Sequence, residues 1–242
     1  HDLSKQSILV LENFGPNKYA EIITKKNRKK IYRLAVDTIF DIQKIRSSDL
    51  SKYSLNMFIA ESNLFFDWYL KNFKSNKINL LKKEFNALFK SYLSCIDIPQ
   101  VLVHRDFHID NLFYLSKSNS VKCGLIDYQD AVIGPCTYDL VSLTQDARID
   151  VPKQLEYELI NYFLESNLKI KKEDFMLSYN LLAIQRHMKV LGIFCRLSLR
   201  DNKDQYLQHL PRVKKMLYEN LKKEKFEKFN LLLSPLLNHV RY

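Results

Sequence analysis

The stretch that decides the fold is residues 101–111, which read VLVHRDFHIDN. It opens with an apolar run at residues 101–104, which is typical of a short buried strand, and continues into charged and polar side chains. Two more extended apolar runs follow at residues 112–115 and 123–127, with polar residues between them. The sequence therefore predicts a small β-element whose strands are joined by polar loops.

On both sides of this β-element the apolar residues recur with a helical period. The chain has few glycines and prolines, four and six in 242 residues, and 46% of its residues are hydrophobic. We therefore expect a mainly helical α+β fold with the β-element near its middle. Helices are expected over residues 18–45, 55–73, 78–96, 138–147, 154–166, 172–199, 206–223 and 225–237.

The composition also bears on partners and location. A net charge of +11 favours an anionic partner, and a helical nucleic-acid-binding domain is one alternative. The lysines are spread along helical stretches among Glu and Asn, however, which is more typical of solvated helix faces. No apolar run approaches the roughly 18 residues of a membrane span, and the four cysteines show no paired spacing. We expect a cytoplasmic protein with reduced thiols and neither a nucleic-acid nor a membrane partner.

The polar part of the opening stretch matches the spacing H-R-D-x-x-x-x-N of a phosphoryl-transfer catalytic loop. An attacking hydroxyl must lose its proton, so Asp106 is the candidate general base. Asn111 offers a neutral oxygen to a metal, and Asp127 offers a carboxylate at the end of the next strand. Mg²⁺ prefers such oxygen ligands, so the sequence predicts a site for Mg²⁺ and ATP.

Two histidines in the same stretch permit another interpretation. His104 and His108 have H-x-x-x-H spacing, which resembles a zinc clasp when it lies on a helix. A loop provides no common helical face, so zinc is disfavoured here. We expect His104 to support the loop through a hydrogen bond.

Taken together, these segments resemble the aminoglycoside phosphotransferase and choline kinase-like superfamily, whose catalytic lobe is protein-kinase-like. The likeness is greatest to its bacterial branch of N-acetylmuramate/N-acetylglucosamine anomeric kinases. It extends over nearly the whole chain. The matching runs are residues 9–15, 65–70, 103–111, 124–131, 134–135 and 138–143, and later 185–186, 192–194, 196–197 and 210–213.

The resemblance implies roles for further residues. It makes Asp106 the catalytic base, and Asn111 and Asp127 the magnesium ligands. Residues 9–15 would form the hinge beside adenine, with Glu12, Asn13 and Phe14 as cofactor-binding candidates. Asp139 would be a buried acid that supports the catalytic loop, although an ordinary carboxylate at a helix N-terminus explains it equally well.

The resemblance also implies a domain division. Residues 1–16 would be the last strand of an amino-terminal lobe and the hinge, and residues 17–242 a helical catalytic carboxy-terminal lobe. The apolar run at residues 7–12 is expected to be a single strand, paired either with the later strands or with a sheet outside this chain. The phosphate-covering loop and phosphate-binding lysine of the family have no match here. We therefore expect the amino-terminal ATP-clamping lobe to belong to the same polypeptide and to be absent from this chain, which alone is expected to be inactive.

The acceptor remains open between several small molecules. A sugar or amino sugar is expected, and an anionic one would suit the cations of residues 172–199, Arg186 among them, which could equally face solvent. Gln129 and Asp130 are further substrate-binding candidates next to Asp127. The alternatives are an aminoglycoside kinase, a choline or ethanolamine kinase, and a non-catalytic pseudokinase that only binds ligands.

Overall fold

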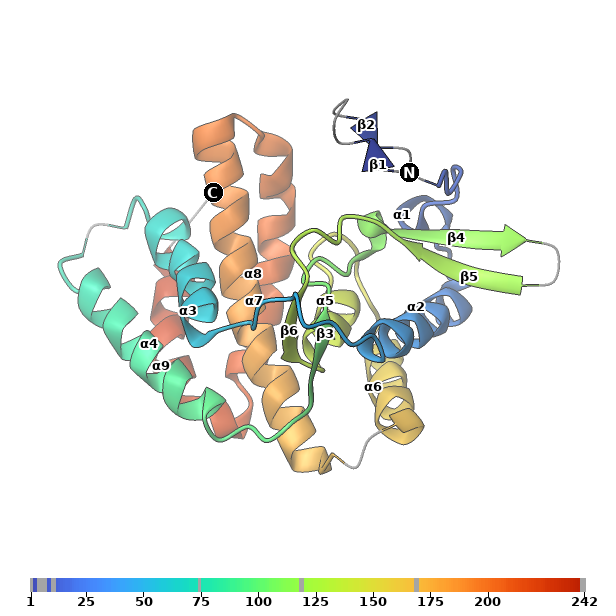
Figure 1. Ribbon diagram of the computed structural model, residues 1–242. Coiled ribbons are helices and arrows are strands. Elements are labelled where there is room, and N and C mark those ends of the chain that lie inside the picture. Colours follow the sequence, from blue (N-terminus) through green and yellow to red (C-terminus); the bar gives the residue numbers. More distant parts are fainter. Residues whose placement is uncertain are drawn as a thin grey trace.

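The computed structural model describes residues 2–3, 8–9, 12–73, 75–117, 120–167 and 170–239. Helices dominate this part of the chain, and the strands are short (Figure 1). The prediction of a mainly helical α+β fold is confirmed. Within the described ranges, no helix is both long enough and apolar enough to cross a membrane.

The helices fall into two groups along the chain. Before the β-element come α1 (Tyr19–Ile22), α2 (Arg28–Gln43), α3 (Leu55–Leu64), the π-helical turn η2 (Phe65–Tyr69) and α4 (Ile78–Leu93). After it come α5 (Tyr138–Thr144), α6 (Lys153–Asn167), α7 (Lys172–Asp201), η4 (Asp204–His209), α8 (Leu210–Leu221), η5 (Glu224–Phe226) and α9 (Glu227–His239).

The helix expected over residues 18–45 is interrupted between α1 and α2. The side chain of Asn27 accepts a hydrogen bond of 2.7 Å from the Thr24 N–H and donates one of 2.9 Å to the Ile22 carbonyl. An Asn side chain that bonds nearby backbone groups competes with helical hydrogen bonding. The periodic apolar pattern continues across this break, which is why the pattern alone predicted one helix.

The strands form antiparallel pairs. β3 (Gln100–Val103) pairs with β6 (Val132–Pro135), and β4 (Leu112–Lys117) pairs with β5 (Ser120–Leu125). The three predicted runs are therefore strands, although β5 ends at Leu125, earlier than expected. β6 was not predicted, because it contains Gly134 and Pro135, which usually mark turns or strand ends.

The amino-terminal strand has a partner that the sequence did not suggest. β2 (Ile8–Leu9) pairs with β1 (Asp2–Leu3), with Asp2 opposite Leu9. Among the described residues β2 does not pair with a later strand, and pairing of its other edge with a sheet outside the chain stays a prediction. Residues 7, 10 and 11 of the expected strand lie outside the described residues.

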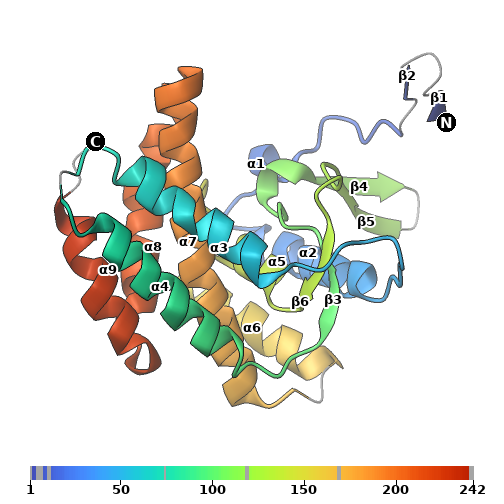
Figure 2. The same ribbon diagram turned by 60° about the vertical axis from the view of Figure 1, so that its left-hand side comes forward.

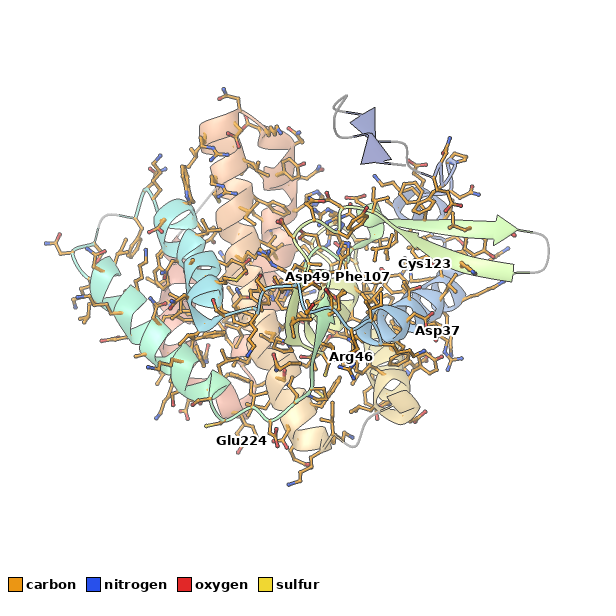
Figure 3. The ribbon with its side chains drawn as sticks, in the orientation of Figure 1. Asp37, Arg46, Asp49, Phe107, Cys123 and Glu224 are labelled. Carbon is orange, nitrogen blue, oxygen red and sulfur yellow. The ribbon has the colours of Figure 1, made fainter. Side chains whose placement is uncertain are left out.

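Helix α7 runs through the helical half of the molecule and packs against α3, η2, α5 and α8 (Figures 1 and 2). Gly192 of α7 faces the end of α3, where a Cβ atom would overlap the backbone carbonyl of Leu64. Only glycine permits this close helix contact. The β-strands, α2 and α6 lie on the other side of the molecule, and the loop after β3 lies near its middle, where Phe107 is fully buried (Figure 3).

Candidate active site

The loop that follows β3 carries the proposed base. It leaves the strand after Val103 and reaches η3 (Ile109–Asn111), which leads directly into β4. Arg105 has a φ of 73°, a left-handed conformation that is uncommon for side chains larger than glycine. Asp106, the next residue, is half-buried. The backbone reversal at Arg105 therefore presents Asp106 at the turn of the loop.

Asp139 at the start of α5 lies beneath this turn. Its carboxylate accepts hydrogen bonds from the backbone N–H groups of His104 at 2.7 Å and Arg105 at 3.0 Å. The side chain is buried, and burial raises the pKa of Asp139, while the two N–H groups act in the opposite direction. The ring nitrogen Nε2 of His104 lies 3.0 Å from the Ile126 carbonyl oxygen. The two expected support residues thus contact the loop and the end of β5.

A second buried carboxylate contacts the other end of the loop. Asp146 accepts hydrogen bonds from the N–H groups of Ile109 at 3.2 Å and Arg148 at 2.8 Å. Arg148 in turn forms an ion pair of 2.8 Å with Asp110. The sequence did not point to Asp146. The available signal was its position seven residues after Asp139, about two helical turns within the helix expected over residues 138–147, although α5 ends at Thr144, before Asp146.

Asn111 and Asp127 meet at the open end of the β4–β5 hairpin. The register pairs Leu112 with Leu125, and the N–H of Ile126 donates to the Asn111 carbonyl at 3.2 Å. Asn111 precedes β4, and Asp127 follows β5 with a left-handed φ of 70°. The hairpin register therefore brings these two residues to the same end of the hairpin.

The oxygen atoms available at this end of the hairpin are suitable ligands for a hard cation. Asn111 uses its Nδ2 to donate to the Asp106 carbonyl at 3.0 Å, which leaves the amide oxygen for another partner. The Asp127 carboxylate is exposed and accepts a hydrogen bond of 2.8 Å from Gln129. Among the described residues there is no cluster of three His, Cys, Asp or Glu side chains that could hold a metal. One carboxylate and one amide oxygen suit Mg²⁺, which completes its shell with water and phosphate oxygens.

The residues predicted to bind the acceptor differ in burial. Gln129 and Asp130 are exposed beside Asp127, and the Asp130 carbonyl accepts a hydrogen bond of 3.0 Å from Arg105. Arg186 on α7 is buried, with its Nη1 donating to the Arg105 carbonyl at 2.9 Å and its guanidinium 5.6 Å from the Tyr138 ring centroid. Arg186 therefore contacts the loop from within the protein, whereas Gln129 and Asp130 face solvent.

The residues that directly follow the expected hinge run along β4. The Tyr114 N–H donates to the Asn17 carbonyl at 2.8 Å, and Lys18 forms a bridge with Phe113. Phe14 packs over Gly124 of β5, where a Cβ atom would lie 2.8 Å from the Phe14 ring. Asn13 accepts a hydrogen bond of 2.8 Å from Gly15, and Glu12 and Asn13 are exposed. Of the three cofactor-binding candidates, Phe14 thus packs on the hairpin that joins Asn111 to Asp127.

Glu61 of α3 is a buried acid that the sequence did not single out. It pairs with Lys189 of α7 at 2.9 Å and with the guanidinium of Arg105. Burial raises the pKa of Glu61, but Lys189, Tyr53 and Arg105 together lower it overall, so the carboxylate stays ionised. Glu61 and Lys189 come from helices far apart in the sequence, which explains why no local motif revealed the pair.

Residues 9–169 match the family model described as the phosphotransferase enzyme family. The chain belongs to this family. Among curated proteins, it is 31% identical over 220 residues to an N-acetylmuramate/N-acetylglucosamine kinase of Pseudomonas aeruginosa, a match that covers 86% of this chain. It is 30% identical over 217 residues to the kinase of the same name from Pseudomonas putida, again over 86% of this chain. The chain spans 63% of the length of each of these relatives.

Solved structures agree with this family assignment at the level of the fold. A choline/ethanolamine kinase family protein from Mesorhizobium loti matches with a TM-score of 0.58 at 13% identity, covering 86% of this chain and 66% of that one. The ADP-bound aminoglycoside phosphotransferase APH(2'')-Ib matches with a TM-score of 0.55 at 13% identity, covering 87% and 71%. These likenesses show that the phosphotransferase fold is present.

Proposed function

We propose that this chain forms the catalytic part of a kinase that transfers a phosphoryl group from ATP to a hydroxyl of a sugar or amino sugar. The observation that carries the proposal is the meeting of Asn111 and Asp127 at one hairpin edge, beside the loop that presents Asp106. The family match supports phosphoryl transfer. The names of the relatives support N-acetylmuramate or N-acetylglucosamine as the acceptor class.

Asp106 acts on the acceptor in this proposal. Its carboxylate takes the proton of the acceptor hydroxyl while that oxygen bonds to the γ-phosphorus, and the bond between the γ-phosphorus and the bridging oxygen breaks to release ADP. Asn111 and Asp127 would hold Mg²⁺, which neutralises charge on the phosphates when bound. Asp139 and Asp146 keep the loop in place from below.

The domain division is part of the same proposal. Residues 1–16 supply the hinge and the end of an ATP-clamping lobe, and residues 17–242 supply the catalytic lobe. Contact between residues 14–18 and β4 supports this division. If the hinge binds adenine, the nucleotide would lie beside the strand that begins after Asn111, the proposed metal ligand. The remaining phosphate contacts would come from the amino-terminal lobe of the same polypeptide.

Phosphorus NMR of the full-length protein tests the function. The sample contains magnesium-ATP and, in separate tubes, N-acetylmuramate, N-acetylglucosamine, choline, ethanolamine and an aminoglycoside. A new phosphate-ester signal with the amino sugars is expected. Ester formation only with choline, ethanolamine or the aminoglycoside would replace the acceptor proposal. ATP binding without transfer to any acceptor would favour the pseudokinase alternative.

A further inference from the structure

Arg105 joins the loop that carries Asp106 to two other parts of the molecule through its side chain. Its guanidinium forms an ion pair with Glu61 of α3, and its Nη1 donates a hydrogen bond of 3.0 Å to the backbone carbonyl of Asp130. The guanidinium also lies over the Tyr53 ring, 5.2 Å from the ring centroid. The side chains of Arg105 and Glu61 are only 15% and 12% exposed. Two nitrogens of one planar group therefore bind a carboxylate of α3 and a carbonyl of another segment.

The carbonyl that this guanidinium binds belongs to a turn that directly follows Asp127. In the turn, the Ala131 N–H donates to the Tyr128 carbonyl at 3.0 Å, and the Gln129 side chain donates to the Asp127 carboxylate at 2.8 Å. Residues 126–130 are all exposed, so packing into the core does little to fix their position. The hydrogen bond from the guanidinium thus attaches this exposed turn to the interior of the protein.

Glu61 gives the guanidinium a fixed partner. Its carboxylate also accepts hydrogen bonds from Lys189 at 2.9 Å and Gln185 at 3.1 Å, both on α7. A carboxylate that is bound by a second helix has little freedom to move, and charge-assisted hydrogen bonds are stronger than those between neutral groups. The ion pair therefore fixes the arginine side chain at the end that faces α3.

The backbone of Arg105 points to the same role for its side chain. Its φ of 73° lies in the left-handed region, which glycine would adopt without strain. Strained backbone of this kind persists only where the surrounding contacts determine it. The presence of an arginine at this position indicates that its side chain contributes through what it binds.

We propose that Arg105 is a positioning residue: held by Glu61, it fixes the turn after Asp127 relative to the loop that carries Asp106. The roles of Asp106 and Asp127 in this inference rest on the proposed function. Arg105 touches neither acceptor nor nucleotide in the proposal; it acts through the Asp130 carbonyl, and so sets the distance between the base and the metal ligand. A misplacement of about 1 Å in a catalytic site can cost about 10²-fold in rate.

The substitution Arg105→Lys separates the bridge from the charge. Lysine keeps the positive charge beside Glu61 and has the same backbone strain, but its single ammonium does not reproduce the planar fork of arginine. The first measurement is NMR backbone relaxation of the full-length protein without metal, nucleotide or acceptor. We expect the order parameters of residues 128–130 to fall from about 0.85, typical of rigid backbone, toward about 0.6. Unchanged order parameters would overturn the proposal.

The second measurement is steady-state kinetics with magnesium-ATP and the acceptor identified by phosphorus NMR. Arg105→Lys should lower kcat about 10- to 100-fold and raise the magnesium concentration needed for half-maximal activity. Arg200→Lys, the same substitution at an exposed ion pair with Asp201, is the matched control and should leave both values unchanged. A wild-type kcat in Arg105→Lys with a flexible turn would show that the bridge does not position the site, and the proposal would fail.

The relaxation measurement separates this inference from the proposed function, because it requires no catalysis. A loss of order in residues 128–130 supports the bridge even if no acceptor is phosphorylated, and unchanged order contradicts it even in an active kinase. If Arg105→Lys does not yield folded protein, Glu61→Asp replaces it. That variant keeps a carboxylate for Lys189 but shortens the side chain by one methylene, so the turn should again lose order and kcat should fall. Wild-type order in the turn of Glu61→Asp would refute the proposal.

Discussion

The side-chain amide of Asn111 donates a hydrogen bond of 3.0 Å to the backbone carbonyl of Asp106. A proposed metal ligand thus fixes the backbone of the proposed base. An aspartate at position 111 could not donate this bond, because an ionised carboxylate only accepts hydrogen bonds. The two roles proposed for Asn111, toward the metal and toward the loop, therefore both depend on the amide.

The first prediction concerns the base. Asp106→Asn in the full-length protein should lower kcat by about 10²–10⁴-fold, the usual contribution of a positioned general base. ATP affinity should hardly change, because the proposed nucleotide contacts run through the hinge and the metal. Steady-state kinetics with varied ATP checks both quantities. An intact kcat with weakened ATP binding would place Asp106 on the phosphate side instead.

The second prediction concerns Asp127. Its left-handed φ of 70° makes asparagine the suitable substitution, because asparagine tolerates this conformation better than alanine does. Asp127→Asn should abolish turnover while the thermal unfolding temperature stays near that of wild type, since the side chain is exposed. Activity equal to wild type would remove Asp127 from the metal site.

The third prediction concerns the contact between hinge and hairpin. A Cβ atom at position 124 would lie 2.8 Å from Cδ2 of Phe14, so Gly124→Ala must displace that ring. Overpacking typically costs about 1–3 kcal/mol, and a cost of this size in nucleotide binding would lower ATP affinity about 5- to 160-fold if the displaced hinge binds adenine. Titration with a fluorescent nucleotide measures this affinity. Adding Phe14→Leu should recover part of the loss, and unchanged affinity in Gly124→Ala would argue against the hinge assignment.

The fourth prediction concerns the contact between α3 and α7. In an exposed helix, Gly→Ala stabilises by about 1 kcal/mol. Gly192→Ala should instead destabilise the protein by about 1–3 kcal/mol or more, because the added Cβ overlaps the Leu64 carbonyl. Urea unfolding measures the change. Lys172→Ala, at the exposed start of the same helix, is the control and should stay within about 0.5 kcal/mol of wild type.

The fifth prediction concerns acid stability. Burial and the nearby Arg186 lower the pKa of His187 from 6.5 to about 3 in the folded protein. The unfolded chain therefore binds a proton at this histidine first as the pH falls. The stability that comes from neutral His187 is fully present above about pH 6.5 and is lost as the pH falls toward 3, by at most about 1.4 kcal/mol per pH unit. His187→Leu should reduce the slope of unfolding free energy between pH 6 and 4 by about that amount. Urea unfolding at several pH values checks it, and an identical slope in the variant would contradict it.

The parts of the site that follow one another in the chain could be predicted from the sequence. The spacing from His104 to Asn111, with an apolar run on either side, identified the loop, and the next run led to Asp127. The parts that arise from packing could not. Glu61 reaches Arg105 from a distant helix, and no local pattern marks it. β6 could not be predicted, because pairing with β3, rather than its own residues, makes this segment a strand. For the same reason the sequence could suggest that Arg186 binds an anionic acceptor, whereas its hydrogen bond to Arg105 emerged only in the folded chain.

The loop that carries Asp106 is attached at both ends to one short stretch of chain, through Asp139 near its start and Asp146 near its end. These carboxylates are buried, so the loop acquires its order when α5 packs into the core. An acceptor that arrives at such a loop has no flexible segment to immobilise, and binding therefore avoids the conformational entropy cost of about 1–2 kcal/mol for each residue fixed. The affinity for the acceptor would then depend on the contacts it makes and on its desolvation, with little contribution from ordering of the protein.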